Sequence, residues 1–491
     1  MPEKLSVSSR VTCPGASENN SMEPFKILSE QEVEEIHNAS LQVLGEMGVV
    51  LTHPATRAML LEAGAKENGD RLLLPVDLIN QCLAGCGGPV TTRGRNGKVV
   101  SIGGGELQWH NLGGARDIYD TATGKRRGAT VQDIRDTTRL LDALDQATTV
   151  TPFFTPLDVP GELMSLAMYR HALPFTTKPL QGPGVQTAQE VKFAVEMAQV
   201  IGPVQEVLTM SVSPVSPLTF PDEMVASMVE IARYGIPFGP LPCPTAGTTA
   251  PLSLAGALTQ QNAEVLASLV IVQSVNPGLP MIYCGRLAMM EPRTGTSIWG
   301  GVELGIASAA TVQLGHYYHL PVNVYGLSTN SHSLEIQNGY ERALNAIIPA
   351  LAGADELSGI GEMGAGVMGS LAQIVVDNDI AASVRRTLRG IEVSEASQAV
   401  EVIRSVMDGP RTFVAEKHTV DYLRNGEIFI SKIAERSTFD EWHLAGRAGM
   451  AQHAQAKAET ILKNHQVPPL EQQQERELER IMQAAEDELV H

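Results

Sequence analysis

The sequence predicts an α/β protein of the (β/α)8 TIM-barrel type, with an N-terminal extension of helices and β-hairpins and additional helices at the C-terminus. Three observations lead to this prediction. The chain has 491 residues, which is enough for one large barrel with additions. Short apolar runs alternate with amphipathic segments, as parallel strands joined by helical crossovers require. Polar and glycine-rich residues follow several of the apolar runs, at the positions where α/β folds carry their chemistry.

The first 129 residues are predicted to extend the barrel at its N-terminus. Residues 1–28 are polar and show no periodicity, which predicts a disordered or extended lead-in. Ser29 and Glu32 then form a capping box, and apolar residues at helical spacing predict a first helix at 30–47. Further helices and a small glycine-rich antiparallel β insertion complete the segment 29–129.

The repeating order of strands and helices begins with the predicted barrel segment, 130–395. Seven strands are predicted at 147–154, 174–180, 206–213, 236–242, 279–284, 320–325 and 354–360. The helices that follow them are predicted at 161–172, 186–201, 221–234, 254–275, 297–317, 333–350 and 370–387. A doubly wound sheet also fits this order, but the regular repeat and the lack of an early glycine fingerprint favour a barrel.

Two parts of the chain are less well defined by the sequence. The eighth strand lies either near 388–394 or in the region before Thr130. Residues 396–491 are predicted to form a C-terminal helical extension. Its charged, Gln-rich last helix either wraps the barrel or pairs with a second subunit, and this second possibility leads us to expect a homo-oligomer.

The composition argues against several classes of function. With a formal charge of −19 and a pI near 5.1, the chain lacks the clustered Lys and Arg of a nucleic-acid or acidic-membrane surface. It also lacks the apolar region of a signal peptide and any run of about 20 apolar residues, so a cytoplasmic location is expected. Five scattered cysteines predict reduced structural thiols, and no residue cluster predicts a protein-bound metal.

Residues that follow the predicted strands are the candidates for the site, because a barrel carries its active site at the carboxyl ends of its strands. The aromatic candidates are Phe153, Phe154, Tyr283, Trp299 and Tyr325. Such rings could surround a quaternary ammonium group, and the alternative is that they cap the core. The polar candidates for binding a carboxylate are Arg286, Arg293, Asn330 and His332. Surface charge and helix capping are the alternatives for this polar group.

A glycine-rich loop follows the seventh predicted strand, where Gly364, Gly366 and Gly369 match the spacing of a dinucleotide-binding fingerprint. The match comes late in the chain, and no acidic residue lies at the expected distance after it. The loop could instead approach a phosphate-bearing ligand or form a tight turn into the next helix.

Three segments of the sequence carry a family resemblance: DIYDTATGKRRGATVQDIRDTTRLLDAL, NVYGLSTNSHSLEIQNGYERALNAIIPALAGADELSGIGEMGAGVMGSLAQIVVDNDIA and HAQAKAETILKNHQVPPL. They resemble the trimethylamine:corrinoid methyltransferase superfamily, from residue 117 to about 468, so the likeness covers most of the chain. Founding members of that superfamily are (β/α)8 barrels that carry pyrrolysine at the barrel mouth. This sequence has only standard residues, and the position aligned with pyrrolysine falls within Gly326–Ser328.

The resemblance implies a methyltransferase that moves a methyl group from a quaternary amine to Co(I) of a corrinoid protein. Without pyrrolysine, the expected substrate is glycine betaine, giving dimethylglycine. Proline betaine, carnitine, γ-butyrobetaine and trimethylamine are alternative substrates. The implied corrinoid, cob(I)alamin, is carried by a cognate partner protein. A TIM-barrel lyase or isomerase and a non-catalytic betaine-binding protein are the alternative classes.

Such a reaction needs no general acid and no protein nucleophile, because a quaternary ammonium already contains a good leaving group, a neutral tertiary amine. Together with the residue types, the resemblance implies three groups of functional residues. The catalytic group is Tyr325, His332 and Glu362; the substrate-binding group is Phe154, Tyr283, Arg286, Trp299 and Asn330; the group that allows close approach of the corrinoid is Gly364, Gly366 and Gly369.

Overall fold

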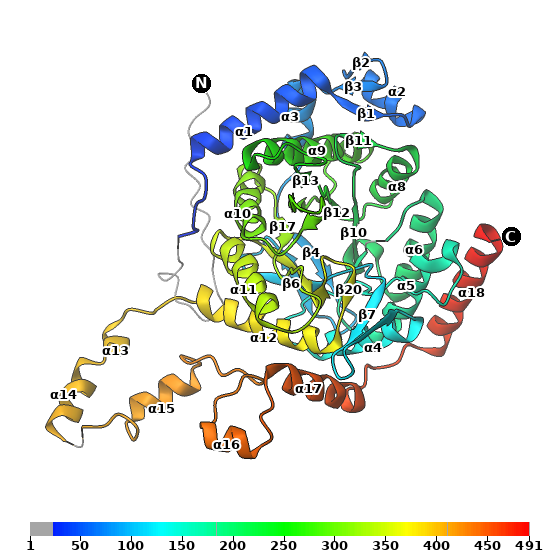
Figure 1. Ribbon diagram of the computed structural model, residues 1–491. Coiled ribbons are helices and arrows are strands. Elements are labelled where there is room, and N and C mark those ends of the chain that lie inside the picture. The colour runs from blue at the N-terminus through cyan, green and yellow to red at the C-terminus, as the bar shows by residue number, and fades with distance from the viewer. Residues whose placement is uncertain (1–22, 183, 410, 491) are drawn as a thin grey trace.

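The computed structural model describes residues 23–182, 184–409 and 411–490. At its centre, short parallel strands lie inside a ring of helices (Figure 1), which is a TIM-barrel-like arrangement of the predicted α/β class. The predicted lead-in, 1–28, lies mostly outside the described residues. Among the residues described, no helix is both long enough and apolar enough to cross a membrane.

The central strands form two parallel ladders. In chain order the strands are β6 (Gln108–Asn111), β9 (Leu180–Gly182), β10 (Leu208–Val212), β12 (Phe238–Pro240), β14 (Tyr283–Gly285), β17 (Val322–Tyr325) and β18 (Glu356–Ile360). One ladder has the order β12, β10, β9, and the other has the order β14, β17, β18, β6. The strands are buried over most of their length, so the core of the protein includes both faces of the ladders.

Isolated contacts connect the two ladders on both sides. A bridge at Phe238 joins β12 to the chain just before β14. On the other side, the segment 148–154 pairs with β9 through Val150, and the amide of Thr148 donates to the carbonyl oxygen of Trp109 in β6 at 2.9 Å. This segment coincides with the first strand predicted from the sequence, 147–154.

The strand whose position the sequence left open is β6. It lies before Thr130, inside the segment predicted as an extension, and pairs in parallel with β18. The alternative position, 388–394, contains the end of a helix and no strand. The sequence QWHN could not be identified as a central strand, because four residues between glycine-rich turns are too few to show a periodicity.

A helix follows each central strand, counting the segment 148–154. These helices are α4 (Val131–Ala143), α5 (Met164–Ala172), α6 (Ala188–Ile201), α8 (Asp222–Arg233), α9 (Leu254–Val275), α10 (Val302–Tyr317), α11 (Ile336–Leu351) and α12 (Leu371–Leu388). Each helix packs against the next one in this order, and α12 also packs against α4. The predicted strand 174–180 is shorter in the structure, because a 3-10 turn (Leu173–Phe175) occupies its first residues.

The N-terminal extension covers one side of the ring. Helix α1 (Glu30–Gln42) begins with the predicted capping box of Ser29 and Glu32 and continues as a π-helical turn (Val43–Met47). After it come β1 (Val49–Leu51), α2 (Pro54–Glu62), β2 (Lys66–Asn68), β3 (Arg71–Leu73) and α3 (Val76–Ala84). Helices α1, α2 and α3 pack on α9, which is why α9 is apolar on nearly all its faces.

Short hairpins and turns lie at both ends of the central strands: the β4–β5 hairpin contacts residues just before β9, β10 and β17, and the β7–β8 hairpin pairs with β20 after β18. The expected antiparallel pairs are present as β4 (Val90–Arg93) with β5 (Val99–Ile102) and β7 (Asp117–Asp120) with β8 (Lys125–Gly128). The remaining short elements are η2 (Gly161–Leu163), α7 (Val204–Val207), β11 (Thr219–Phe220), β13 (Thr245–Ala246), β15 (Ala288–Met290), β16 (Ser297–Ile298), β19 (Glu362–Met363) and β20 (Met368–Gly369). Strands β19, β20, β7 and β8 form one small sheet.

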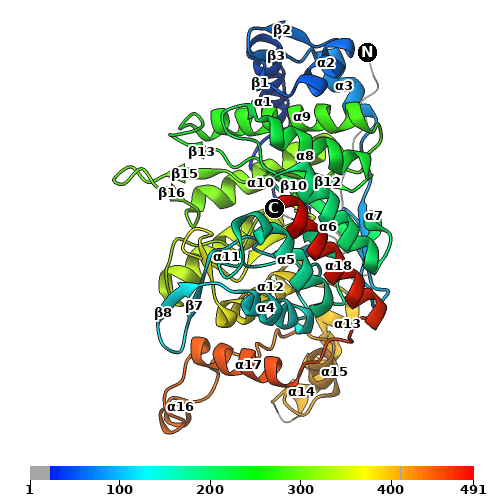
Figure 2. The same cartoon turned by 90° about the vertical axis from the view of Figure 1, so that its right-hand side faces the viewer.

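The C-terminal extension is helical, as predicted. Its helices are α13 (Glu395–Gln398), α14 (Val400–Asp408), α15 (Lys417–Arg424), α16 (Phe439–Leu444), α17 (Met450–Asn464) and α18 (Gln472–Leu489). Helix α17 packs on α12 and α4, whereas α18 packs on α6 and α5 (Figure 2). The Gln-rich last helix therefore wraps its own ring of helices, which was the first of the two predicted possibilities.

A buried hydrogen-bond network fastens the N-terminal extension to the strands. Asn262 on α9 donates to the hydroxyls of Ser40 (2.9 Å) and Tyr318 (2.8 Å), and its side-chain oxygen accepts a hydrogen bond from the hydroxyl of Tyr283 (2.8 Å). The Asn262 side chain is fully buried. Its amide thus satisfies three hydroxyl groups at once, on α1, on α10's C-terminal end and on β14.

We expect Asn262→Ala to lower the free energy of unfolding by about 2–4 kcal/mol, because it removes three buried hydrogen bonds and takes from the Tyr283 hydroxyl the partner it has in Asn262. Urea denaturation followed by circular dichroism measures this change. The control is Asn464→Ala on α17, an exposed position where the change should stay within about 0.5 kcal/mol. Equal effects of the two substitutions would contradict the role assigned to this network.

Candidate active site

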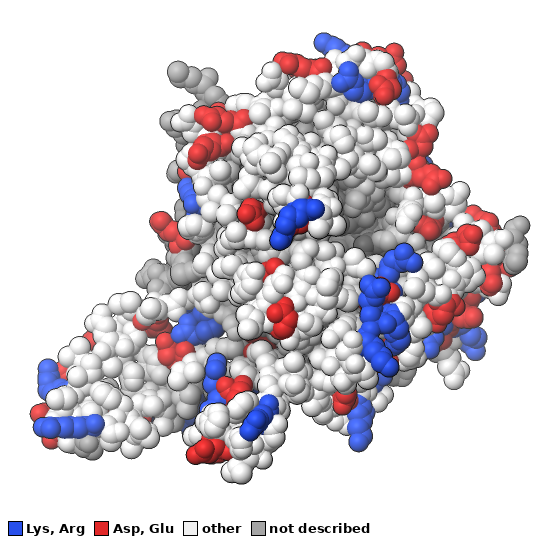
Figure 3. Space-filling view, viewed as in Figure 1, with Lys and Arg blue, Asp and Glu red and all other residues white. Residues whose placement is uncertain are grey.

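A cavity lies inside the ring of central strands. The centre of a water-sized sphere can occupy about 110 Å³ of this cavity, which is several times the space that one water molecule needs. On the face seen in Figure 3, the surface is hollowed above these strands. The cavity is lined by His110, Asn111, Leu112, Gly113, Thr151, Gln181, Gly182, Thr209, Met210, Ser211, Leu241, Ile282, Cys284, Arg286, Asn323, Tyr325, Glu356 and Ser358.

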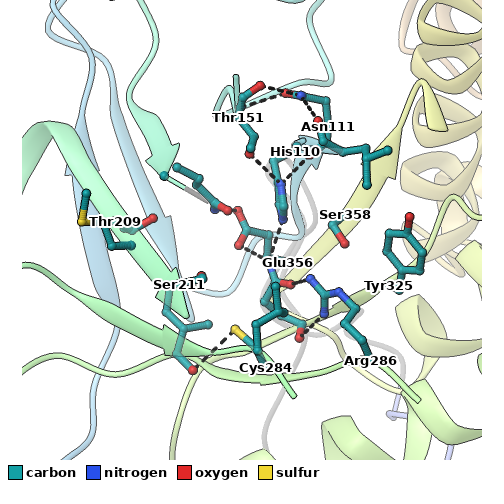
Figure 4. Close-up of a pocket in the computed structure, with 18 residues that line it drawn as sticks. His110, Asn111, Thr151, Thr209, Ser211, Cys284, Arg286, Tyr325, Glu356 and Ser358 are labelled. Atoms are coloured by element: carbon teal, nitrogen blue, oxygen red, sulfur yellow. Dashed lines mark hydrogen bonds between the residues drawn. The ribbon is translucent and has the colours of Figure 1, made fainter. Parts of the chain in front are cut away.

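A chain of polar side chains crosses the floor of this cavity (Figure 4). The carboxylate of Glu356 accepts hydrogen bonds from the side-chain amides of Gln181 and Asn323, each at 2.5 Å. The oxygen of the Asn323 side chain accepts a hydrogen bond from the guanidinium of Arg286. These partners fix the orientation of Asn323, because the reversed amide would point its oxygen at Glu356 and its N–H groups at Arg286.

His110 completes the chain as a neutral base. Its Nε2 lies 2.9 Å from the amide nitrogen of Asn323, which can only donate, so Nε2 accepts. Its Nδ1 lies 2.8 Å from the carbonyl oxygen of Asn111 and therefore carries the proton. Burial lowers the pKa of His110, although the nearby Glu356 carboxylate acts in the opposite direction.

Arg286 contributes a buried positive charge to the cavity wall. Its side chain donates to the carbonyl oxygens of Gly285 and Asn323, both at 3.1 Å, and to the side-chain oxygen of Asn323. A guanidinium has five N–H donors, so these three bonds leave some of them available. Within the described part of the chain, Arg286 forms no ion pair with a carboxylate. It is therefore able to bind an anion inside the cavity.

Aromatic rings adjoin this charge. The guanidinium carbon of Arg286 lies 5.5 Å from the centre of the Tyr325 ring. The ring of Trp299 meets Tyr325 edge-on, with the ring centres 5.7 Å apart and the planes at 85°. Burial raises the pKa of Tyr325 well above its usual range, and the Glu362 carboxyl acts in the same direction. The phenol is thus neutral and presents an apolar ring with one hydroxyl group.

Hydrogen bonds brace the loop that carries Trp299 against the loop after β17. The side-chain oxygen of Asn330 accepts from the backbone N–H groups of Trp299 (2.7 Å) and Gly300 (2.8 Å). Its amide nitrogen donates to the carbonyl oxygen of Ser297 at 3.1 Å. The backbone N–H of Asn330 in turn donates to Glu341 on α11 at 3.0 Å. The observed contacts of Asn330 therefore position Trp299.

A buried ion network lies behind the glycine-rich loop. Arg342 on α11 donates to Asp377 on α12 at 2.9 Å and lies 3.9 Å from Glu362. Glu362 accepts backbone N–H bonds from Thr329 (3.0 Å) and Gly366 (2.5 Å), so it fastens two loops together. Despite these contacts, burial raises the pKa of Glu362 to about 8 and that of Asp377 to about 6.

The structure places the predicted site residues in three settings. Of these residues, Tyr325 and Arg286 line the cavity, and Trp299 contacts Tyr325. Asn330 and Glu362 stand behind the cavity as hydrogen-bond partners of its loops. His332 is exposed, and Phe154 and Tyr283 are buried outside the cavity lining, Phe154 against Phe153 and Tyr283 against α9.

The predicted glycines also differ in what surrounds them. Gly364 and Gly366 have positive φ angles of +58° and +83°, which favour glycine, and a Cβ at Gly366 would lie 3.9 Å from the hydroxyl of Tyr325. The loop therefore passes directly over the Tyr325 end of the cavity. Gly369 has a different reason to be glycine, because a Cβ there would come within 2.2 Å of the Phe153 ring.

Sequence reasoning did not assign His110, Asn323 or Glu356 to the site. Asn323 and Glu356 are single polar residues inside apolar strands, and such interruptions signal that a strand faces a polar interior. This signal was available in LPVNVY and ADELSGI. His110 could not be found in this way, because its strand was not identified.

Fold and site together define a TIM-barrel-like protein with a central cavity that has a polar floor. In the residues that the structure describes, no group of three or more His, Cys, Asp and Glu side chains is arranged to hold a metal ion. The feature of the cavity best suited to bind a substrate is the Arg286 guanidinium beside the Tyr325 ring, which the Trp299 ring meets edge-on. The class is thus a TIM-barrel-like protein with a cavity for a small molecule inside its strands, where enzymes of this fold carry their sites.

Comparisons with known proteins identify the family. The family model for trimethylamine methyltransferase (MTTB) matches residues 7–489. The chain is 29% identical to trimethylamine methyltransferase MttB of Desulfitobacterium hafniense, with 94% of each chain covered, and 29% identical to MttB of Methanosarcina barkeri, with 94% of this chain and 95% of the relative covered. A glycine betaine methyltransferase of D. hafniense is 27% identical over 91% of this chain and 94% of its own length.

The crystal structure of the M. barkeri monomethylamine methyltransferase MtmB is similar to this one in fold, with a TM-score of 0.52 and 12% identity, covering 90% of this chain and 89% of that one. The chain belongs to the trimethylamine methyltransferase (MTTB) family and is a methyltransferase.

Glu362 gives a pH-dependent prediction. Its pKa in the folded protein, about 8, is above its ordinary value of 4.5, so the folded state binds more protons between these two values. The stabilisation is then complete below about pH 4.5 and is lost as the pH rises through about 8. We expect Glu362→Gln to reduce the fall in unfolding free energy between pH 5 and 8 by at most about 1.4 kcal/mol per pH unit, and the part of the fall that comes from Asp377 should remain.

Urea denaturation at a series of pH values measures this slope. The matched control is Glu62→Gln on α2, an exposed carboxylate, which should leave the slope as in the wild type. The assignment is wrong if Glu362→Gln and the wild type lose stability in parallel over this range.

Proposed function

We propose that this methyltransferase transfers a methyl group from a small quaternary amine that carries a carboxylate, with glycine betaine as the first choice, to Co(I) of a corrinoid protein. The observation that supports this proposal most is the buried, unpaired charge of Arg286 next to the rings of Tyr325 and Trp299. A guanidinium suits a carboxylate, and aromatic faces suit a trimethylammonium group. Glycine betaine carries both groups within a few bonds of each other.

The orientation of the substrate follows from the position of the two features. Arg286 is held down against Asn323 on the cavity floor, whereas Trp299 and the glycine-rich loop lie toward the carboxyl ends of the strands. A betaine with its carboxylate on Arg286 would therefore direct its methyl groups outward. Outward methyl groups are what an acceptor carried by another protein requires.

The electron balance of the transfer is simple. Co(I) supplies both electrons of the new Co–C bond, the C–N bond breaks, and its electron pair leaves with the tertiary amine. The products are methyl-Co(III) and a neutral amine nitrogen, so the chain need not donate or accept a proton. Charge on the substrate cation and the electron-rich cobalt decreases along the reaction, and a dry cavity with fixed dipoles favours such a change.

The loop that would align with pyrrolysine supports a substrate other than trimethylamine. Gly326, Leu327 and Ser328 are all buried. Ser328 donates from its hydroxyl to the carbonyl oxygen of Trp299 at 2.6 Å, and the amides of Gly326 and Leu327 donate to Ser358. These residues therefore supply no reactive side chain to the cavity. A quaternary amine is already activated and needs none.

The surface around the hollow offers a docking face for the acceptor protein. The sheet β19-β20-β7-β8 joins the glycine-rich loop to the β7–β8 hairpin. Lysine and arginine side chains gather at one side of the hollow (Figure 3), and the hairpin exposes Arg116, Lys125, Arg126 and Arg127. Asp117 and Asp133 pair with two of these cations, but Arg116 and Lys125 form no ion pair among the described residues. In a chain of net charge −19, this surface suits an acidic partner.

Methylcobalamin formation from free cob(I)alamin tests the substrate. We expect product with glycine betaine, and little with choline or trimethylamine, which lack the carboxylate. Arg286→Ala should raise KM for glycine betaine about 30-fold or more, since removing one partner of a buried charged pair costs about 2 kcal/mol or more. Arg286→Lys should lie between Arg286→Ala and the wild type.

Arg293→Ala is the matched control, because Arg293 is exposed in the turn of the β15–β16 hairpin and paired with Glu291, and it does not line the cavity. A complete lack of product with every amine would refute methyl transfer to the corrinoid. If glycine betaine gives product and Arg286→Ala leaves its KM unchanged, the role of Arg286 would be refuted, but methyl transfer to the corrinoid would not.

Replacing Arg116 and Lys125 by glutamate tests the docking face. With the corrinoid protein as acceptor, the double variant should raise KM about tenfold at low salt, and the difference should shrink as salt rises. With free cob(I)alamin its rate should equal that of the wild type. The control variant, Lys66→Glu with Lys463→Glu, reverses two exposed charges elsewhere. If both double variants behave alike toward the protein acceptor, docking does not use this hairpin.

A further inference from the structure

Residues 391–449 form an extended arm that packs little on the rest of its own chain (Figures 1 and 2). Leaving out residue 410, the only buried side chains in the arm are Val406 and Ile433. Helices α13 to α16 make no extended contact with another described element. The arm is held chiefly by ion pairs of Glu427 with α12 and by Ser431, which donates to Asp379 at 2.7 Å.

The arm nevertheless exposes many large apolar side chains. Of the 27 such side chains that the described residues expose, 13 lie between Ile391 and Leu444. On α14, Val400, Ile403 and Met407 follow the i, i+3, i+7 spacing of one helix face. Monomeric soluble proteins seldom leave this much contiguous apolar surface in water. The exposed apolar side chains of the arm are therefore typical of a surface that binds another protein.

A second apolar surface lies on the ring of helices. Helix α11 exposes Ile336, Tyr340 and Leu344, at 87%, 56% and 42%, and their i, i+4, i+8 spacing puts them in one stripe. This chain's own arm does not cover the stripe, since the three side chains are exposed. An amphipathic helix and an apolar helix stripe are complementary surfaces.

We propose that the arm of one copy of this chain packs through α14 against the α11 stripe of a second copy, and that the second copy's arm does the same in return. A reciprocal exchange of this kind is the usual arrangement of a symmetric dimer, in which each copy contributes the same two surfaces. Each contact pairs the three exposed apolar side chains of α14 with the three of the α11 stripe, and a symmetric dimer makes this contact twice.

A second copy fits the arm better than the methyl acceptor does. The acceptor must leave after each transfer, and surfaces of transient partners are less apolar than those of permanent ones. The arm's charge is nearly balanced, with ten acidic and seven basic residues among 391–449, so the arm offers little electrostatic attraction to a charged partner. The acceptor is better matched to the cationic β7–β8 hairpin.

The proposed contact also reaches the active site, because α11 has a second face. Arg342 and Glu341 on that face hold Glu362, Thr329 and Asn330, which position the loops over the cavity. A partner's arm on the outer stripe would fix the orientation of α11 from outside. This inference concerns assembly, so it does not depend on which amine is the substrate.

Light scattering after size-exclusion chromatography tests the assembly with the full-length protein. At micromolar concentration, the wild type should have at least twice the 52.6 kDa mass of one chain, also in 1 M NaCl, since apolar contacts are not screened. Ile403→Glu with Met407→Glu on the arm, and Leu344→Glu with Tyr340→Glu on α11, should each shift the mass toward one chain. Leu252→Glu, at an exposed apolar position outside both surfaces, should keep the wild-type mass.

Mixing the two double variants tests whether the contact is made between copies. The arm variant keeps an intact α11 and the α11 variant keeps an intact arm, so the mixture should form dimers with one intact contact. A wild type of 52.6 kDa, or an arm variant that is folded by circular dichroism and keeps the wild-type mass, would overturn the proposal. If the arm variant has the mass of one chain but the α11 variant keeps the wild-type mass, the arm would still mediate assembly. The surface that receives it would then not be α11.

Discussion

A single buried guanidinium holds together the loops that shape the cavity. Arg342 extends from α11 into a space with no exposed surface, where it donates to the carbonyl oxygen of Leu327 and to Asp377, each at 2.9 Å, and faces Glu362. Through these partners it fixes the loop after β17, helix α12 at Asp377 and the loop after β18. A charge so deeply buried is costly unless several groups surround it, and this requirement makes the three elements depend on one another.

The cavity itself is organised around dipoles in place of reactive groups. A chain of hydrogen bonds runs from the carboxylate of Glu356 through the side-chain amide of Asn323 to the guanidinium of Arg286. Each hydrogen bond fixes the orientation of the next group. His110 is kept neutral and accepts from the same amide. Nothing in this arrangement needs to move a proton. It suits a reaction whose difficulty is to bring a cation and an electron-rich metal centre together without water.

Helix α11 connects the inside of the protein with its surroundings. Its inner face carries Arg342 and Glu341, and its outer face carries the stripe to which we assign a partner's arm. In the same way, the small sheet of β19, β20, β7 and β8 connects the glycine-rich loop with the cationic hairpin. Assembly and docking of the acceptor are thereby assigned to different faces, so that neither partner competes with the other.

The α/β class, most of the helices and the capping box of α1 could be predicted from the sequence, because they depend on periodicity and on residues close together in the chain. Apolar alternation showed where strands and helices lie, and the glycines showed where the chain turns. The family resemblance pointed to methyl transfer. These are all properties that a linear pattern preserves. Arg286 and Tyr325 were assigned to the site because they follow or end predicted strands, whereas Trp299, inside the predicted helix 297–317, was assigned as one of a set of aromatic residues.

Only the tertiary structure decided which side chains meet. Tyr283 follows the same rule as Tyr325, yet its hydroxyl binds Asn262 on α9, because successive strand residues point to opposite faces and a shift of one residue reverses the direction. Asn323, Glu356 and His110 come together from β17, β18 and β6, although His110 and Glu356 are 246 positions apart in the chain (356 − 110). The pairing of β6 with β18 brings them together. That pairing rests on backbone hydrogen bonds between distant segments, which local sequence does not encode.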